Sequence, residues 1–177
     1  MAFGLKYDNV DRYIKSYAKY ILRQARYRLE KKDVTGALSN SLDYEIIKTK
    51  KGWTIEFTGA DYADYVAKGV SGTEGTRTYI DIEGTRKRSP YSYGDKMPPT
   101  NSIFNWVKDR GIKGRDKETG RFITDKSLAF AISKGIQKKG VPAASFFTQP
   151  ISWSFNVFKM EIQKQVKIDL LKYITDK

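Results

Sequence analysis

The side chains best able to support catalysis in this chain are carboxylates, lysines and tyrosines, because its 177 residues include no histidine and no cysteine. Histidine is the commonest general base and a frequent zinc ligand, and cysteine supplies thiolates for nucleophilic attack and metal binding. Catalytic arrangements built on either residue are therefore excluded.

One group of carboxylates lies in a predicted β-hairpin, where Asp43, Glu45 and Glu56 accompany Lys48 and Lys50. A magnesium-dependent nuclease needs two or three carboxylates and a lysine on adjacent strands, to hold the ion and orient a water molecule. Asp43 and Glu45 share the strand face opposite the apolar one, and such a face is normally solvated. An ordinary polar sheet face is the favoured interpretation, and the nuclease is the weaker alternative.

Glycine-rich segments do not predict a cofactor site. Residues 69–75 superficially resemble a dinucleotide-binding fingerprint, but no parallel strand and crossover helix surround them. Residues 111–115 lack the Gly-Lys-Ser/Thr ending of a phosphate-binding loop. We therefore expect no cofactor, no metal ion and no enzymatic activity.

The strongest compositional signal is the excess of basic residues. Lysine and arginine number 33 against 20 aspartates and glutamates, for a formal charge of +13, and residues 85–140 hold 14 basic and 5 acidic residues, a net charge of +9. Two clusters stand out: Arg86, Lys87 and Arg88, and then Arg110, Lys113, Arg115, Lys117 and Arg121. Tyr91 and Tyr93 follow the first cluster, a mixture that single-strand binders use for phosphate contact and base stacking. The clusters indicate either an acidic partner, which is nucleic acid or another protein, or a plain pair of solvated loops, and the sequence leaves these alternatives open.

Apolar spacing predicts long helices near both ends of the chain and a hairpin between them. Residues 9–32 carry apolar side chains at three- and four-residue steps, and Asp8 or Asn9 is expected to cap the first turn. Alternating apolar residues on both sides of a turn at residues 50–52 predict two antiparallel strands. The last helix is expected over residues 148–174. Its expected buried stripe consists of Phe155, Phe158, Ile162, Val166, Leu170 and Tyr173.

In the middle of the chain, the sequence pattern predicts short helices and strands within a long loop. They are a helical turn within residues 61–70, a strand at 78–82, and helices at 100–111 and 125–138. The whole order predicts one α+β domain over residues 1–177: a long N-terminal helix, a small antiparallel sheet, a long basic insertion with short helices, and a long C-terminal helix. Residues 71–139 are the expected inserted arm.

Aromatic residues recur on two helix faces, with Tyr13, Tyr17 and Tyr20 on the first helix and Phe155 and Phe158 on the last. Such faces favour a core or a subunit interface over a cofactor box. The apolar stretches are too short to span a membrane, and the first residues show no secretory signal, so no membrane partner is expected. The lack of cysteine fits synthesis in a reducing cytoplasm.

Three segments resemble those of the phage tail-completion, or head–tail joining, proteins. They are TGALSNSL at 35–42, TGADYADYVAKG at 58–69 and GVPAASFFTQPI at 140–151. The second is similar to the family's Tyr-Ala-x-Tyr-Val-x-x-Gly segment after a hairpin, and the third to the Pro-containing junction before its last helix. Two features depart from the family: residues 71–139 exceed the corresponding loop, and Ile151 stands where alanine is more usual.

The resemblance implies a structural subunit of a bacteriophage neck, made in the host bacterial cytoplasm and located in the virion. Its implied partners are copies of itself in a homo-oligomeric ring, adjacent portal, adaptor or tail proteins, and double-stranded DNA that passes through the lumen. The implied subunit interface includes Tyr62, Tyr65, Val66, Phe146 and Phe147. The basic residues expected to meet a partner or DNA are Arg86, Lys87, Arg88, Arg115 and Arg121. A free nucleic-acid-binding module is the main alternative.

Overall fold

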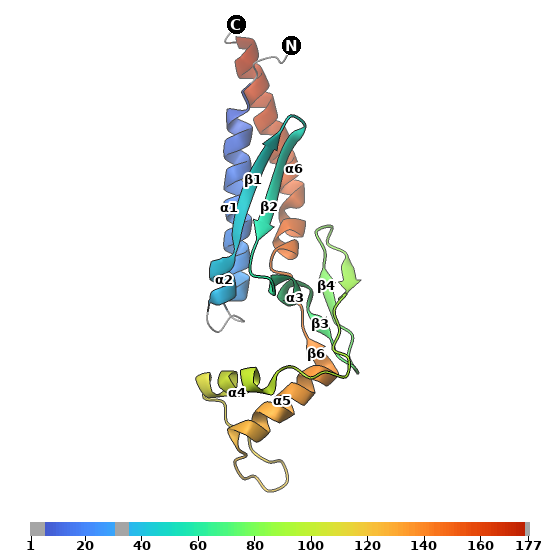
Figure 1. Cartoon of the computed structure of the whole chain (residues 1–177). Coiled ribbons are helices and arrows are strands. Elements are labelled where there is room, and N and C mark those ends of the chain that lie inside the picture. The colour runs from blue at the N-terminus through green and yellow to red at the C-terminus, as the bar shows by residue number, and fades with distance from the viewer. Residues whose placement is uncertain (1–5, 31–35, 176–177) are drawn as a thin grey trace. The chain divides into compact units, whose positions relative to one another are not determined.

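The computed structural model describes residues 6–30 and 36–175, and the chain divides into two compact units. The first unit comprises residues 1–63, 80–85 and 145–177, and the second comprises residues 64–79 and 86–144. The predicted α+β class is confirmed, with long helices near both ends and small antiparallel sheets between them (Figure 1).

The first unit is built on two long helices that run side by side, α1 (Asp8–Leu29) and α6 (Thr148–Thr175) (Figure 1). The short helix α2 (Ala37–Ser41) leads into a hairpin of β1 (Asp43–Thr49) and β2 (Gly52–Thr58). The hairpin register places Tyr44 opposite Phe57 and Ile46 opposite Ile55, as the alternating pattern predicts. The predicted continuation of the first helix to residue 32 lies outside the described residues.

The core of the first unit forms along one face of α1. Seven residues at helical spacing are buried there: Val10, Ile14, Ala18, Ile21, Leu22, Ala25 and Leu29. Leu38, Leu42 and Phe146 are buried in the same unit. Phe147 contacts the hairpin, because its ring centroid lies 4.9 Å from that of Phe57 on β2. Burial of this stripe supplies the main stabilising term, because each fully buried aliphatic side chain contributes about 1.5–3 kcal/mol.

The prediction that the side chain of Asp8 or Asn9 caps the first helix is wrong. The N-cap position is Tyr7, whose side chain makes no capping bond. The carboxylate of Asp169 on α6 instead accepts bonds from the backbone N–H groups of Asn9, at 3.1 and 3.2 Å, and Val10, at 3.0 Å. The free N–H groups of a first turn need an acceptor, and here the neighbouring helix provides it.

The expected buried stripe of the last helix is also partly wrong. Phe155 and Leu170 are exposed, at 46% and 41%, whereas Phe158, Ile162 and Val166 are half-buried. The buried positions of α6 are Pro150 and Asp169. One narrow face of the helix therefore meets the rest of the unit.

The second unit contains its own helix pair and short strands. Most of α3 (Ala63–Lys68) belongs to it, with β3 (Val70–Ser71), α4 (Thr100–Asp109), α5 (Asp125–Lys139) and β6 (Gly140–Val141). Val107, Ala129 and Ser133 are fully buried where α4 packs on α5. The region expected as an inserted arm is therefore folded around these helices.

A second hairpin joins β4 (Thr78–Ile80) to β5 (Arg86–Arg88). The predicted strand at 78–82 ends at Ile80, because Asp81 starts a turn whose N–H groups at Glu83 and Thr85 bond to its carboxylate. The sequence did not predict β5, since three exposed basic residues show no apolar alternation.

Candidate assembly surfaces

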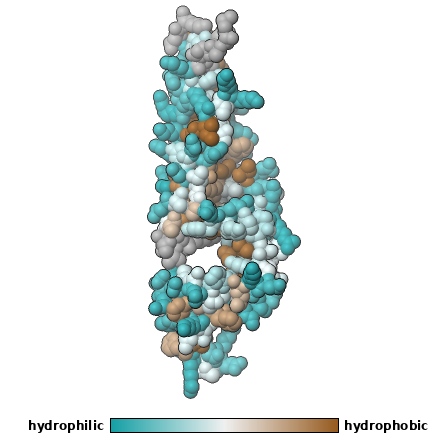
Figure 2. Space-filling model, viewed as in Figure 1, coloured by the Kyte–Doolittle hydropathy of each residue, from teal (hydrophilic) through white to brown (hydrophobic). Residues whose placement is uncertain are grey.

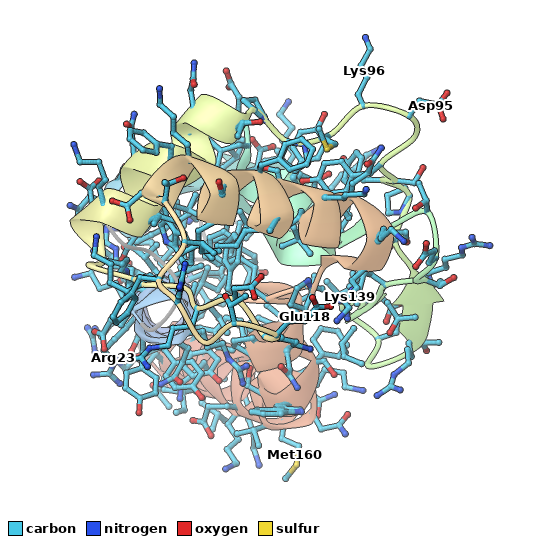
Figure 3. All side chains as sticks on the ribbon, turned by 90° about the horizontal axis from the view of Figure 1, so that it is seen from below. Arg23, Asp95, Lys96, Glu118, Lys139 and Met160 are labelled. Carbon is cyan, nitrogen blue, oxygen red and sulfur yellow. The ribbon has the colours of Figure 1, made fainter. Side chains whose placement is uncertain are left out.

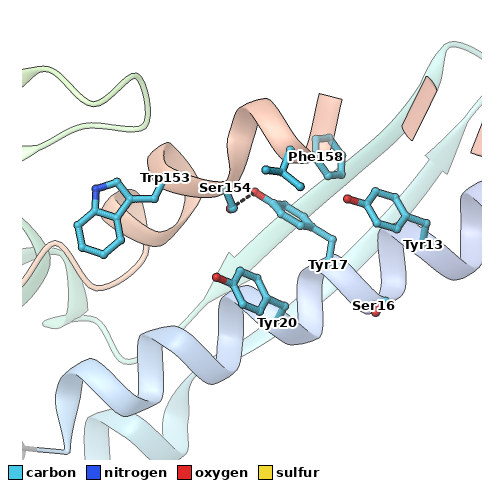
Figure 4. Close-up of a pocket in the computed structure, with 8 residues that line it drawn as sticks. Tyr13, Ser16, Tyr17, Tyr20, Trp153, Ser154 and Phe158 are labelled. Atoms are coloured by element: carbon cyan, nitrogen blue, oxygen red, sulfur yellow. Dashed lines mark hydrogen bonds between the residues drawn. The ribbon is translucent and has the colours of Figure 1, made fainter. Parts of the chain in front are cut away.

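An apolar groove of about 450 Å³ runs along the seam between α1 and α6 (Figure 4). We call it the aromatic groove. Its lining consists of Tyr13, Ser16, Tyr17 and Tyr20 from α1, and Trp153, Ser154, Val157 and Phe158 from α6. Tyr13, Tyr17 and Tyr20 share a helix face because they are spaced by four and three residues. The sequence thus identified the tyrosine side of this surface and Phe158, although it left open whether they form core or interface.

Ring packing holds the groove in one shape. Tyr17 lies 4.3 Å from Phe158 between ring centroids, and Tyr13 stacks on the same ring at 5.8 Å. The Tyr17 hydroxyl and Ser154 Oγ form a hydrogen bond of 2.9 Å (Figure 4). Rings that are already packed against one another lose little entropy when a partner binds, so this part of the groove is preorganised.

The groove tyrosines act as neutral hydrogen-bonding groups. Burial raises the pKa of the Tyr17 phenol, an effect that its hydrogen bond with Ser154 only partly offsets. Burial and the nearby Glu161 carboxylate likewise raise the pKa of Tyr13. Both phenols therefore stay protonated near neutral pH, and neither is prepared to act as a base.

A second apolar face of α6 continues from the groove along the exposed side of the helix. We call it the outer stripe: Trp153, Val157, Met160, Ile168 and Leu171. Their exposed fractions are 68%, 66%, 62%, 40% and 51% in that order. Met160 projects away from the ribbon in Figure 3, and on the face shown in Figure 2 hydrophobic side chains form patches among hydrophilic ones. Residues at these steps share one side of a helix, so α6 carries a second apolar side.

The outer stripe is the surface that sequence reasoning missed. Its spacing of four and three residues from Trp153 to Met160 is a signal that the sequence does contain. The same helix also carries the series from Phe155 to Tyr173, and only the position of α1 shows which side is covered.

The predicted interface residues fall in different environments. Phe146 is only 1% exposed, so its assignment to a subunit interface is corrected: it belongs to the core and offers no area to a neighbour. Phe147 is half-buried. Tyr62 of the first unit is 46% exposed and Tyr65 of the second is 49% exposed, whereas Val66 is half-buried.

Tyr65 is held by a small polar cluster of the second unit. Its ring lies 4.3 Å from that of Tyr91, whose hydroxyl donates to the Asp64 carboxylate. Lys68 also donates to Asp64, at 2.8 Å. Burial raises the pKa of Asp64, but the hydrogen bonds from Lys68 and Tyr91 outweigh it and keep the pKa below its usual value. The cluster therefore ties α3 to residue 91 and sets the direction of the Tyr65 ring.

The predicted basic contact residues all lie in the second unit and are exposed. Arg86, Lys87 and Arg88 form β5. Arg115 and Arg121 meet in one compact loop, in which Asp116 N–H donates to Arg121 O at 2.9 Å. The Arg115 guanidinium lies over the exposed ring of Phe122, 4.3 Å from its centroid. The structure thus groups the second cluster around a turn.

The charge is unequally shared between the units. Residues 64–79 and 86–144 contain 16 basic and 7 acidic side chains, a net charge of +9, which leaves +4 for the rest of the chain. This excess suits an anionic partner surface.

The hairpin carboxylates do not converge on a metal site. Glu45 lies opposite Glu56 across the strands, and Asp43 accepts a bond from its neighbour Tyr44 N–H. All three side chains are exposed. Lys48 is engaged elsewhere, in an ion pair of 2.7 Å with Asp11. Within residues 6–30 and 36–175, no group of three acidic, histidine or cysteine side chains is placed to hold a metal ion.

No family model, curated protein or solved structure matches this chain. In the described part of the chain, no helix combines the length and apolarity needed to cross a membrane.

Proposed function

We propose that the chain is a structural subunit of the neck of a tailed bacteriophage, which acts by protein–protein assembly around the DNA channel and has no enzymatic activity. The observation that carries the proposal is the outer stripe, a long apolar helix face left uncovered within the subunit. Large exposed apolar patches are rare on proteins that work alone and mark interaction surfaces.

The resemblance of three segments to tail-completion proteins supports the same function. Residues 36–42 join α1 to the hairpin through α2, residues 58–69 follow the hairpin and contain α3, and residues 140–151 lead into α6. The order of a long helix, a hairpin, a short helix and a last long helix is the order that the resemblance implies.

The second unit suits a contact with a neighbouring ring. Its exposed cations at Arg86, Arg88 and Arg121 provide a surface for an acidic protein. A channel through which DNA slides does not favour a tight grip, because each phosphate contact adds affinity. We therefore assign these residues first to protein docking and only to passing contact with DNA.

Deletion of the coding gene from its phage tests the proposal. We expect filled heads and separate tails that fail to join, and recovery of infectious particles when the purified full-length chain is added to the lysate. Labelling with a specific antibody should mark the head–tail junction in electron micrographs. Complete, infectious particles made without the gene would overturn the proposal.

A free nucleic-acid-binding module is the second candidate. It is favoured by the net charge of the second unit and by the Arg115–Phe122 pair, since exposed aromatic and cationic groups bind single strands. Tight binding of an oligonucleotide at physiological salt, together with complete particles in the deletion strain, would select it.

A further inference from the structure

The aromatic groove and the outer stripe form one continuous surface. Trp153 and Val157 line the groove and also begin the stripe. Arg28 steadies this junction, because its guanidinium lies 4.7 Å from the Trp153 ring centroid and donates to Gln149 at 2.8 Å. An exposed tryptophan beside a tyrosine-lined groove has the composition of an interface hot spot.

Both edges of this surface are basic. On α1, Arg12 and Lys19 lie one turn before and after Ser16, and Arg23 lies one turn after Tyr20. On α6, Lys167 precedes Leu171 by one turn at the edge, and Lys164 lies within the outer stripe itself, one turn after Met160 and one turn before Ile168. All five side chains are exposed.

The acidic group at this surface is already engaged. Glu161 accepts bonds from Gln165 at 2.7 Å and Lys164 at 3.1 Å. The Glu161–Lys164 pair neutralises itself, so Arg12, Lys19, Arg23 and Lys167 leave the edges positive.

We infer that the aromatic groove and outer stripe bind an amphipathic helix of another protein, with an apolar face that enters the groove and acidic residues along its edges. Helix-in-groove recognition uses anchors at three- and four-residue steps, which match the steps along α1 and α6. The inference takes up the assembly role proposed above and names the chemistry of its partner.

The charge of the edges argues against a second copy as the occupant. Every copy carries the same cations beside the stripe, and each chain has a formal charge of +13. Pairing of two such surfaces would bring like charges together, which opposes association. Acidic flanks on a different protein would be attracted instead.

The packing of the rings argues against nucleic acid. Tyr13 and Tyr17 already contact Phe158, so each of these rings has less area open to a stacked base. Beyond Trp153 the stripe continues with aliphatic and methionine side chains, which offer no aromatic plane. An apolar helix face fits this part better than bases do.

The test uses the full-length chain and two designed helical peptides of about 20 residues, a length that spans roughly 30 Å. Both peptides carry the same leucine face, one flanked by glutamates and the other by lysines. Fluorescence anisotropy of a labelled peptide should show that the glutamate peptide binds at least about tenfold more tightly than the lysine peptide.

Two variants locate the binding. Val157→Asp should lower the affinity for the glutamate peptide by at least about tenfold, because it places a charge in the groove. Ile82→Asp, a matched change at another exposed apolar residue, should leave binding unchanged. The double variant Lys19→Glu with Arg23→Glu should weaken binding of the glutamate peptide and strengthen binding of the lysine peptide. The control double variant Lys126→Glu with Lys134→Glu should change neither affinity.

Equal effects of Val157→Asp and Ile82→Asp, or no difference between the peptides, would overturn the inference. So would a homodimer in sedimentation that Val157→Asp dissolves, or displacement of the peptide by oligothymidylate. A failed peptide experiment with a joining defect in the deletion strain would leave the neck proposal standing. Binding of the glutamate peptide that depends on Val157, together with complete particles in the deletion strain, would support the groove inference and overturn the neck proposal.

Discussion

At the scale of single residues, Asp169 joins the two long helices. The residue is only 3% exposed, and its carboxylate accepts hydrogen bonds from Asn9 and Val10 at the start of α1, which provide partners for its charge. The Asn9 side-chain amide adds a bond of 2.6 Å. A buried carboxylate is tolerated only when it is bonded in this way, and the positive end of a helix dipole favours it further.

We expect Asp169→Asn to lower the free energy of unfolding by about 1–3 kcal/mol, because an amide nitrogen would face N–H donors. Urea denaturation followed by circular dichroism measures the change. The exposed Asp95, labelled in Figure 3, provides the control: Asp95→Asn should change stability by less than about 0.5 kcal/mol. Equal stabilities of the two variants would contradict the capping role.

The same residue predicts a dependence on pH. Burial raises the pKa of Asp169, but the bonds from Val10 and Asn9 outweigh it and hold the pKa below its ordinary value of 3.8. The stabilisation is therefore present above pH 3.8 and is lost as the pH falls through the lowered folded-state pKa. The difference between wild type and Asp169→Asn should shrink below about pH 4.

At the scale of elements, glycines permit the close crossing of β3 and β6 at the end of α5. A Cβ on Gly72 would lie 2.1 Å from Lys138 O. Gly140 has a φ of 73°, and a Cβ there would lie 2.2 Å from Val70 O. Backbone atoms cannot yield as a flexible side chain can, so both positions exclude larger residues.

We expect Gly72→Ala to destabilise the chain by more than about 2 kcal/mol, because the new methyl group overlaps backbone. Gly135→Ala is the matched change within α5, where nothing lies within 4 Å of the new Cβ. That variant should gain about 0.5–1 kcal/mol of stability, since glycine is unfavourable inside a helix. Thermal unfolding compares the two, and equal melting temperatures would contradict the close crossing.

At the scale of the whole molecule, the second unit carries a net charge of +9 and the outer stripe belongs to the first. Apolar burial is nearly independent of salt, whereas attraction to phosphate weakens as salt rises. Salt therefore separates the two kinds of contact in a binding experiment.

We expect the full-length chain to bind a DNA duplex weakly at low salt and to lose at least about tenfold in affinity between roughly 50 and 200 mM salt. Arg86→Gln with Arg88→Gln should lower the slope of log affinity against log salt by about 2, because each lost phosphate contact lowers it by about 1. Lys15→Gln with Lys50→Gln, in the first unit, should leave the slope unchanged. Tight binding that persists at the higher salt would contradict the neck proposal.

The sequence by itself determined the long helices, the first hairpin and the helices α4 and α5. The three-to-four-residue spacing of α1, the alternation of the β1–β2 hairpin and the glycines after α4 and α5 depend on local geometry, so each can be read from a short window. Half of the groove was predictable for the same reason, since Tyr13, Tyr17 and Tyr20 share a helix face without reference to any partner.

Only the tertiary structure decided which faces are covered. Helix α6 carries two apolar series, and packing in the first unit half-buries Phe158 and Ile162 while leaving Val157 and Met160 exposed. The cap of α1 comes from Asp169, 160 residues beyond Asn9, where no local pattern could place it. Phe146 is buried rather than exposed for the same reason. Periodicity describes one element at a time, whereas burial depends on contacts between residues that are distant in the sequence.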